Sequence, residues 1–192
     1  MRLAPIPPEK LTPELRRLHE DMISMAGGHL EGFVMKRADG ALVGPFNPML
    51  HFPQFGEPFW NFSKSLIVNS KLPKAAREVA ILVTGARFNA RYELYAHEFV
   101  AHAVGVSAAK IASIAAGQRP ADLSAEEGVA YDVAAALTAG KQLPTSTYQA
   151  AVDAFGEDGV GELCFLVAGY CMVSVLLNAF DISVPGREEG LG

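Results

Sequence analysis

Charged side chains are scarce in this sequence. They make up 19% of 192 residues, whereas half of the residues are hydrophobic, and the net charge is −5. No run of Lys and Arg is present, so the sequence predicts no nucleic-acid partner. The length suits one compact domain with a sizeable core. Because the composition is apolar for a monomer, we expect a homo-oligomer, with a dimer, a trimer and a hexamer all open.

The sequence also lacks an apolar stretch near its start. The first ten residues, MRLAPIPPEK, do not resemble a signal peptide. The longest apolar run spans 163–180, about the shortest length that crosses a membrane. It contains Gly169, Ser174 and Asn178 and has no basic residue beside it. We therefore predict a buried core or interface helix, no membrane partner and a cytoplasmic location.

Cysteine is nearly absent as well. Cys164 and Cys171 fall seven residues apart, which is about 10 Å along a helix. That separation is too large for a disulfide, so both are expected to be reduced core thiols. The sequence shows no metal-ligand cluster, phosphate loop or dinucleotide fingerprint, and we predict neither a metal nor a cofactor.

What the sequence does contain is helical periodicity, which predicts an all-α fold. Thr12-Pro13-Glu14 has the features of a helix start, and His19 on that helix is expected to be solvated. The run from Ser124 to Glu127 indicates a capping box. We divide the single domain into an N-terminal helix with an irregular, pocket-covering segment (1–58), a helical core (59–183) and a flexible tail (184–192).

Two polar side chains stand out in the segment 72–117. Glu78 lies among apolar neighbours on one predicted helix, and His97 lies on the next, one turn after Glu93. If the two helices fold back on each other, Glu78 and His97 meet inside the interface. A carboxylate and an imidazole in apolar surroundings form a proton-transfer pair. The alternative is a polar pair with a structural role only.

The motifs in this segment resemble the core of the carboxymuconolactone decarboxylase and AhpD-like superfamily. The matching runs are Arg77-Glu78-Val79-Ala80-Ile81-Leu82, Tyr92-Glu93-Leu94-Tyr95-Ala96-His97 and Gly105-Val106-Ser107. The peroxidase branch carries C-x-x-C-x-x-x-H in the second run, but its cysteine positions are Ala90 and Glu93 here. The resemblance therefore implies the decarboxylase-like branch, with an oligomeric, AhpD-like helical bundle.

This resemblance implies a cofactor-independent enzyme that moves a proton on a small carboxylic acid or lactone. Glu78 and His97 would be catalytic. We expect eight residues to bind substrate: Tyr92, Glu93, Tyr95, Phe46, Asn47, Met49, Tyr170 and Asn178. Two roles stay open for Glu93, which could act on His97 or stabilise the start of its helix. The alternatives are a non-catalytic oligomer that binds a small molecule and an AhpD-like peroxidase, which the missing cysteines disfavour.

Overall fold

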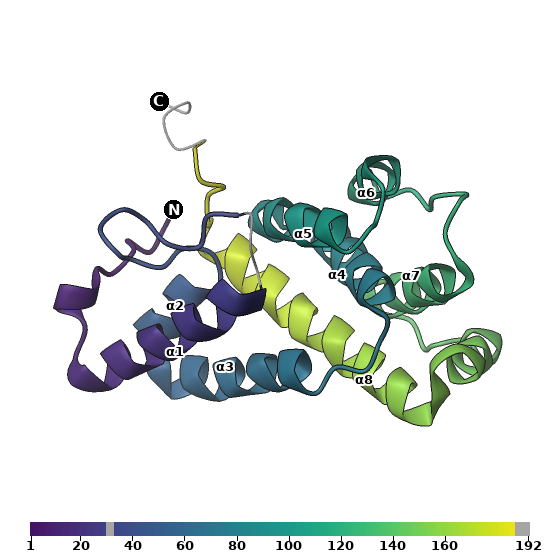
Figure 1. Ribbon diagram of the computed structural model, residues 1–192, viewed down its shortest axis with the longest axis horizontal. Helices are drawn as coiled ribbons and strands as arrows, with labels where there is room; N and C mark the ends of the chain where they lie inside the picture. The colour runs from purple at the N-terminus through teal and green to yellow at the C-terminus, as the bar shows by residue number, and fades with distance from the viewer. Residues whose placement is uncertain (30–32, 187–192) are drawn as a thin grey trace.

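Helices build the structure, a computed structural model that describes residues 1–29 and 33–186 (Figure 1). Its only β pairing in these residues is an isolated bridge between Lys36 and Leu42. The all-α prediction is confirmed. The elements are η1 (Pro8–Lys10), α1 (Pro13–His29), α2 (Phe46–His51), α3 (Pro53–Val68), α4 (Lys74–Phe88), α5 (Arg91–Ala103), α6 (Ala108–Ala115), α7 (Ala125–Thr138) and α8 (Thr145–Ala179).

The core forms where α4 packs against α7 and α8. Every residue of α4 from Val79 to Gly85 is buried, so this helix is enclosed on all sides. Figure 1 shows α8 running between α1 to α3 on one side and α4 to α7 on the other. Side chains of α8 can therefore contact both groups of helices, and a site formed there draws on all of them.

Helix α8 is bent at Gly156, whose φ of 72° and ψ of 171° are not helical. The sequence places a helix end at this glycine, and the chain changes direction there. Helix α8 is long and apolar enough to cross a membrane by length and composition alone, but 44% of its most apolar window is buried within this fold.

The irregular segment before residue 59 contains more helix than the sequence predicts. Its prolines indicate breaks, and the sequence predicts that the next helix after the first spans 59–68. Helix α3 begins instead at Pro53, because a proline in the first helical turn loses no hydrogen bond. Pro58 then lies inside the helix and removes only one backbone bond.

The prediction that His19 is solvated is wrong. Its side chain is buried, and Nε2 lies 2.9 Å from the carbonyl oxygen of Gly40. The connection that follows α1 folds back over this face of the helix, a long-range contact that helical spacing does not reveal. The capping box is confirmed, since Ser124 and Glu127 exchange hydrogen bonds at the start of α7. Of the predicted flexible tail, residues 187–192 lie outside the described residues.

Candidate active site

A tight helical hairpin positions the polar residues of the site. Asn89 adopts a left-handed conformation (φ 50°) at the end of α4, and the N–H of Ala90 donates to the carbonyl of Gly85 at 2.9 Å. The chain thus reverses and α5 packs against α4. A Cβ atom on Gly85 would lie 3.2 Å from Cγ of Glu93. The glycine therefore lets the Glu93 side chain lie directly against α4.

His97 lies between two carboxylates inside this hairpin. Its Nδ1 donates to Oε2 of Glu78 at 2.7 Å. Its Nε2 lies 3.3 Å from Oε1 of Glu93, which has no other partner within the described chain. All three residues are at most 6% exposed. Glu78 fixes the orientation of the imidazole, and the opposite nitrogen faces Glu93.

Burial changes the protonation of this group. It raises the pKa of Glu93 to about 7, an effect that His97 opposes and the negative charge of Glu78 increases. Burial alone would lower the pKa of His97, but Glu78 and Glu93 together outweigh it and raise that pKa. A proton can therefore reside on either His97 or Glu93 near neutral pH, which suits proton transfer.

Arg77 and Tyr170 extend the polar group on either side. The Nη1 atom of Arg77 donates to the carbonyl of Leu66 at 3.0 Å, and its Nε lies 4.0 Å from Oε1 of Glu78. The Tyr170 ring stands edge-on to His97, with ring centres 5.1 Å apart. Burial raises the pKa of Tyr170, and the charge of Arg77 opposes that rise.

These polar groups form one wall of a small cavity with a volume of about 70 Å³. The remaining lining is apolar and rich in aromatic rings, and it comes from α2, α3, α5, α8 and the segment before α2. The lining residues are Phe33, Pro45, Phe46, Met49, Trp60, Ser63, Leu66, Ile67, Arg77, Tyr92, Glu93, Ala96, His97, Gly169, Tyr170 and Val173.

The structure brings most of the residues predicted for the site together. His97 lines the cavity and Glu78 lies behind it, while five of the eight expected binding residues also line the wall: Phe46, Met49, Tyr92, Glu93 and Tyr170.

The other three expected binding residues lie elsewhere. The buried Asn47 amide donates to the carbonyl of Leu3, and the exposed Asn178 amide donates to that of Phe88. The Tyr95 hydroxyl accepts from the N–H of Val34. These hydrogen bonds hold the three side chains against other segments, and none of the three residues lines the cavity. His51, at the end of the helix that carries Asn47, contacts the carbonyl of Ala4 outside the cavity.

Sequence reasoning missed the contribution of α3. Trp60, Ser63 and Ile67 line the cavity, although the helical spacing indicates only a core-facing helix. The signal available was the excess of aromatic residues before position 62. This excess indicates that the segment packs over another part of the protein, but it does not show whether a cavity or a filled core lies beneath the segment.

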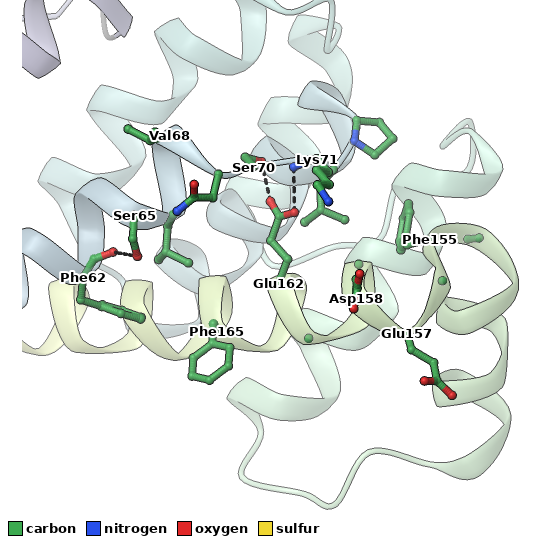
Figure 2. A pocket seen from close by; sticks show the side chains of 18 residues that line it. Phe62, Ser65, Val68, Ser70, Lys71, Phe155, Glu157, Asp158, Glu162 and Phe165 are labelled. Carbon is green, nitrogen blue, oxygen red and sulfur yellow. Dashed lines mark hydrogen bonds between the residues drawn. The ribbon is translucent and has the colours of Figure 1, made fainter.

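A larger hollow of about 1580 Å³ opens elsewhere on the surface, between the α3–α4 connection and α8. Figure 2 shows Glu162 directed at Ser70 and Lys71, while Phe165 points away from them. Glu162 accepts from the Ser70 hydroxyl and from the Lys71 N–H, so its carboxylate anchors the connection. This open groove contains none of Glu78, Glu93 and His97.

Metal ligands and thiols do not gather at the cavity. In the part of the chain that the structure describes, no group of three or more His, Cys, Asp or Glu is arranged to hold a metal ion. Cys164 and Cys171 are free and are absent from the lining. Burial raises the pKa of both thiols, which makes them poor nucleophiles.

Solved structures share this architecture. An alkylhydroperoxidase AhpD core protein, an uncharacterized peroxidase-related protein from Ralstonia eutropha JMP134, is 14% identical, with a TM-score of 0.76 over 97% of this chain and 93% of that one. A cysteine-to-alanine variant of the debrominase Bmp8, in complex with 2,3,4-tribromopyrrole, is 15% identical, with a TM-score of 0.73 over 97% and 92%. The chain has the AhpD-like fold. No protein-family model and no curated protein matches the sequence.

At this level of identity the likeness shows the fold alone. Peroxidase-related and debrominase proteins share that fold, so it hosts more than one chemistry. The activity of this chain therefore depends on its own side chains at the cavity.

Proposed function

We propose that the protein is a cofactor-independent enzyme that transfers a proton on a small carboxylic acid or lactone, with decarboxylation as its reaction. The observation that carries the proposal is the buried row of Glu78, His97 and Glu93, which ends at an aromatic cavity. An ionisable group with a pKa near 7 at the wall of an apolar cavity is typical of general acid–base catalysis.

Each residue of the row has a separate task. Glu78 holds the Nδ1–H of His97 and stabilises the charged imidazole. His97 exchanges a proton with Glu93 through Nε2, and Glu93 faces the cavity. Glu93 is the group that delivers the proton to substrate, because both ring nitrogens of His97 already face carboxylates. His97 restores the proton afterwards.

The reaction needs no cofactor because the substrate accepts its own electrons. The bond between the carboxylate carbon and its neighbour breaks, CO₂ leaves, and the electron pair moves into a conjugated carbonyl to form an enolate. Glu93 then protonates the carbon, so that R–COO⁻ and H⁺ become R–H and CO₂. Apolar walls such as those of Phe46 and Tyr92 exclude water from the site, so the proton that the enolate receives comes from Glu93 and not from solvent.

The thiol chemistry of a peroxidase has less support. The two cysteine positions of the peroxidase branch are occupied by Ala90 and Glu93, and neither cysteine of this chain lines the cavity. A Cys164→Ser, Cys171→Ser double variant should therefore retain full activity. If wild type consumed peroxide and the double variant did not, the peroxidase hypothesis would be restored.

The test is proton exchange measured in D₂O. Wild type is incubated with small 2- and 3-keto acids and unsaturated lactone acids, while ¹H NMR follows C–H exchange and ¹³C NMR follows CO₂. We expect His97→Gln to slow the reaction by about 10²- to 10⁴-fold. His102→Gln is the matched control, because His102 is exposed on the same helix. Equal rates for wild type and His97→Gln would refute the role of this row.

A non-catalytic role is the second candidate, and the apolar nature of the cavity favours it. Twelve of its sixteen lining residues carry no charge and no hydrogen-bonding group beyond a phenol, an indole or the backbone. Such a site can bind a small molecule without changing it. Saturable ligand binding without any proton exchange across the panel would favour this interpretation.

A further inference from the structure

The guanidinium of Arg77 lies in the cavity wall with more donors than the protein uses. Its side chain is 12% exposed and lines the cavity. Of its five N–H groups, one donates to the carbonyl of Leu66. The nearest carboxylate, that of Glu78, lies 4.0 Å from Nε, beyond hydrogen-bonding distance. A buried cation with donors to spare is an anion-binding group.

Tyr170 supplies a second donor beside it. The residue lines the same cavity from α8. Tyr170 and Arg77 line the same cavity, and the charge of Arg77 opposes the rise in the Tyr170 pKa, so the two groups lie close enough for the phenol O–H to donate to a ligand beside the guanidinium. A planar guanidinium and a phenol that converge from two helices match the two oxygens of a carboxylate.

The charges around the cavity favour a monoanion. Arg77 and Glu78 offset each other, so the balance depends on His97 and Glu93. When His97 and Glu93 share one ionisable proton, the four residues together are neutral. When both His97 and Glu93 are protonated, the four residues carry one positive charge. The other ionisable groups at the wall, Tyr92 of α5 and Tyr170 of α8, stay uncharged because burial raises the pKa of both. An anion therefore binds more tightly when Glu93 is protonated.

We propose that Arg77 and Tyr170 bind the carboxylate of a small monoanionic organic acid, and that its binding is coupled to uptake of one proton by Glu93 and His97. This inference rests on the proposed function, whose cavity it concerns, and names its substrate class. The cavity volume of about 70 Å³ is roughly half that of a protein cavity that holds benzene. It fits an acid about the size of acetate or propionate without movement of the walls.

The single tryptophan of the chain provides a direct readout. Trp60 lines the cavity, so its fluorescence reports an occupied site. Wild type is titrated with acetate at constant ionic strength, and acetamide is the uncharged control of the same shape. We expect saturable binding of acetate, none of acetamide, and a Kd that rises about tenfold per pH unit above pH 7. Calorimetry in buffers of different ionisation enthalpy should show uptake of about one proton.

Variants separate the two parts of the proposal. Arg77→Met should abolish acetate binding, whereas Arg87→Met, an exposed arginine on the same helix, should not change it. In Glu93→Gln the Kd for acetate should no longer change with pH. If Arg77→Met does not fold, Arg77→Lys and Tyr170→Phe are measured instead. Each should bind acetate with a Kd at least several-fold higher than that of wild type.

Three results would overturn the inference: equal binding of acetamide, unchanged acetate affinity in the Arg77 and Tyr170 variants, or an unchanged pH dependence in Glu93→Gln.

Failure of this inference can be distinguished from failure of the proposed function. Acetate binding with proton uptake but no exchange on any acid of the panel would refute the reaction only. Exchange on an uncharged lactone without acetate binding would refute the anion site only.

Discussion

Oε1 of Glu93 and Nε2 of His97 lie 3.3 Å apart, one helical turn from each other on α5. Glu78 engages the opposite nitrogen of the same ring, so one imidazole connects two carboxylates. Two buried acids this close to a single base do not both remain ionised easily. The pair of Glu93 and His97 therefore holds a proton that the unfolded chain would have released, and this makes folding depend on pH.

We expect the protein to lose stability as pH rises from 5 to 8. Between the unfolded pKa of Glu93, 4.5, and its folded value of about 7, the folded state binds more protons than the unfolded state. The free energy of unfolding then falls with pH, by about 3 kcal/mol from Glu93 alone. His97 acts in the same direction, because its raised pKa stabilises the fold at low pH and the effect is lost as pH rises through the folded value.

Urea unfolding at pH 5, 6, 7 and 8 measures this slope. Glu93→Gln should flatten it, whereas Glu98→Gln, an exposed acid on the same helix, should leave it unchanged. A slope as steep in Glu93→Gln as in wild type would show that Glu93 is ionised in the folded protein at all these pH values.

Removing the partner of Nδ1 should lower the pKa of His97. In Glu78→Gln the hydrogen bond at 2.7 Å loses its negative acceptor, and burial then opposes a charged imidazole with only Glu93 to balance it. We expect the His97 pKa to fall and the exchange rate to drop about 10- to 100-fold. NMR titration of the ring Hε1 signal, assigned with His97→Gln, measures the pKa. An unchanged His97 pKa in Glu78→Gln would mean that the charge of Glu78 does not stabilise the charged imidazole.

Gly44 should be far more sensitive to substitution than Gly117. Both glycines have a positive φ, 67° and 73°, so an alanine at either strains the backbone by about 1 kcal/mol. A Cβ atom on Gly44 would also lie 2.3 Å from the Tyr92 ring, whereas nothing lies within 4 Å of one on Gly117. We expect Gly44→Ala to cost about 3 kcal/mol and to disturb the cavity wall. Equal losses in thermal unfolding would exclude the clash.

We propose that a second copy of the chain covers the outer face of α8. Phe165, Met172 and Val175 are each about half exposed or more on this face, and no charged residue occurs from 163 to 180. Beside them lies an apolar hollow of about 320 Å³, lined in part by Phe55 and Met172. The exposed side chains of one copy can then pack into the hollow of a second copy, and the reverse, about a two-fold axis.

Light scattering after size exclusion tests this assembly. We expect wild type to run as an oligomer, and Phe165→Glu combined with Met172→Glu to run at a smaller mass, since each new charge would be buried at the contact. Tyr148→Glu, an exposed aromatic residue near the start of α8, is the control and should change nothing. A wild type that runs as a monomer at all concentrations would refute the proposal.

Local sequence features determined several parts of this protein. The spacing of apolar residues, the capping box of α7 and the glycine at 156 predict helices close to where they lie, because each signal acts within one or two turns. The same spacing places Glu78 and His97 on neighbouring helices. Because the turn between these helices is short, the helices pack against each other and the two side chains meet.

Only the tertiary structure decided what surrounds this pair. Arg77 and Trp60 face the cavity, His19 is buried under Gly40, and Asn178 turns to the carbonyl of Phe88, although nothing near them in sequence distinguishes these outcomes. Helical periodicity tells which face of a helix is apolar, but contacts between distant segments determine what covers that face. For the same reason, whether an apolar face fills completely or leaves a cavity depends on how all the helices pack.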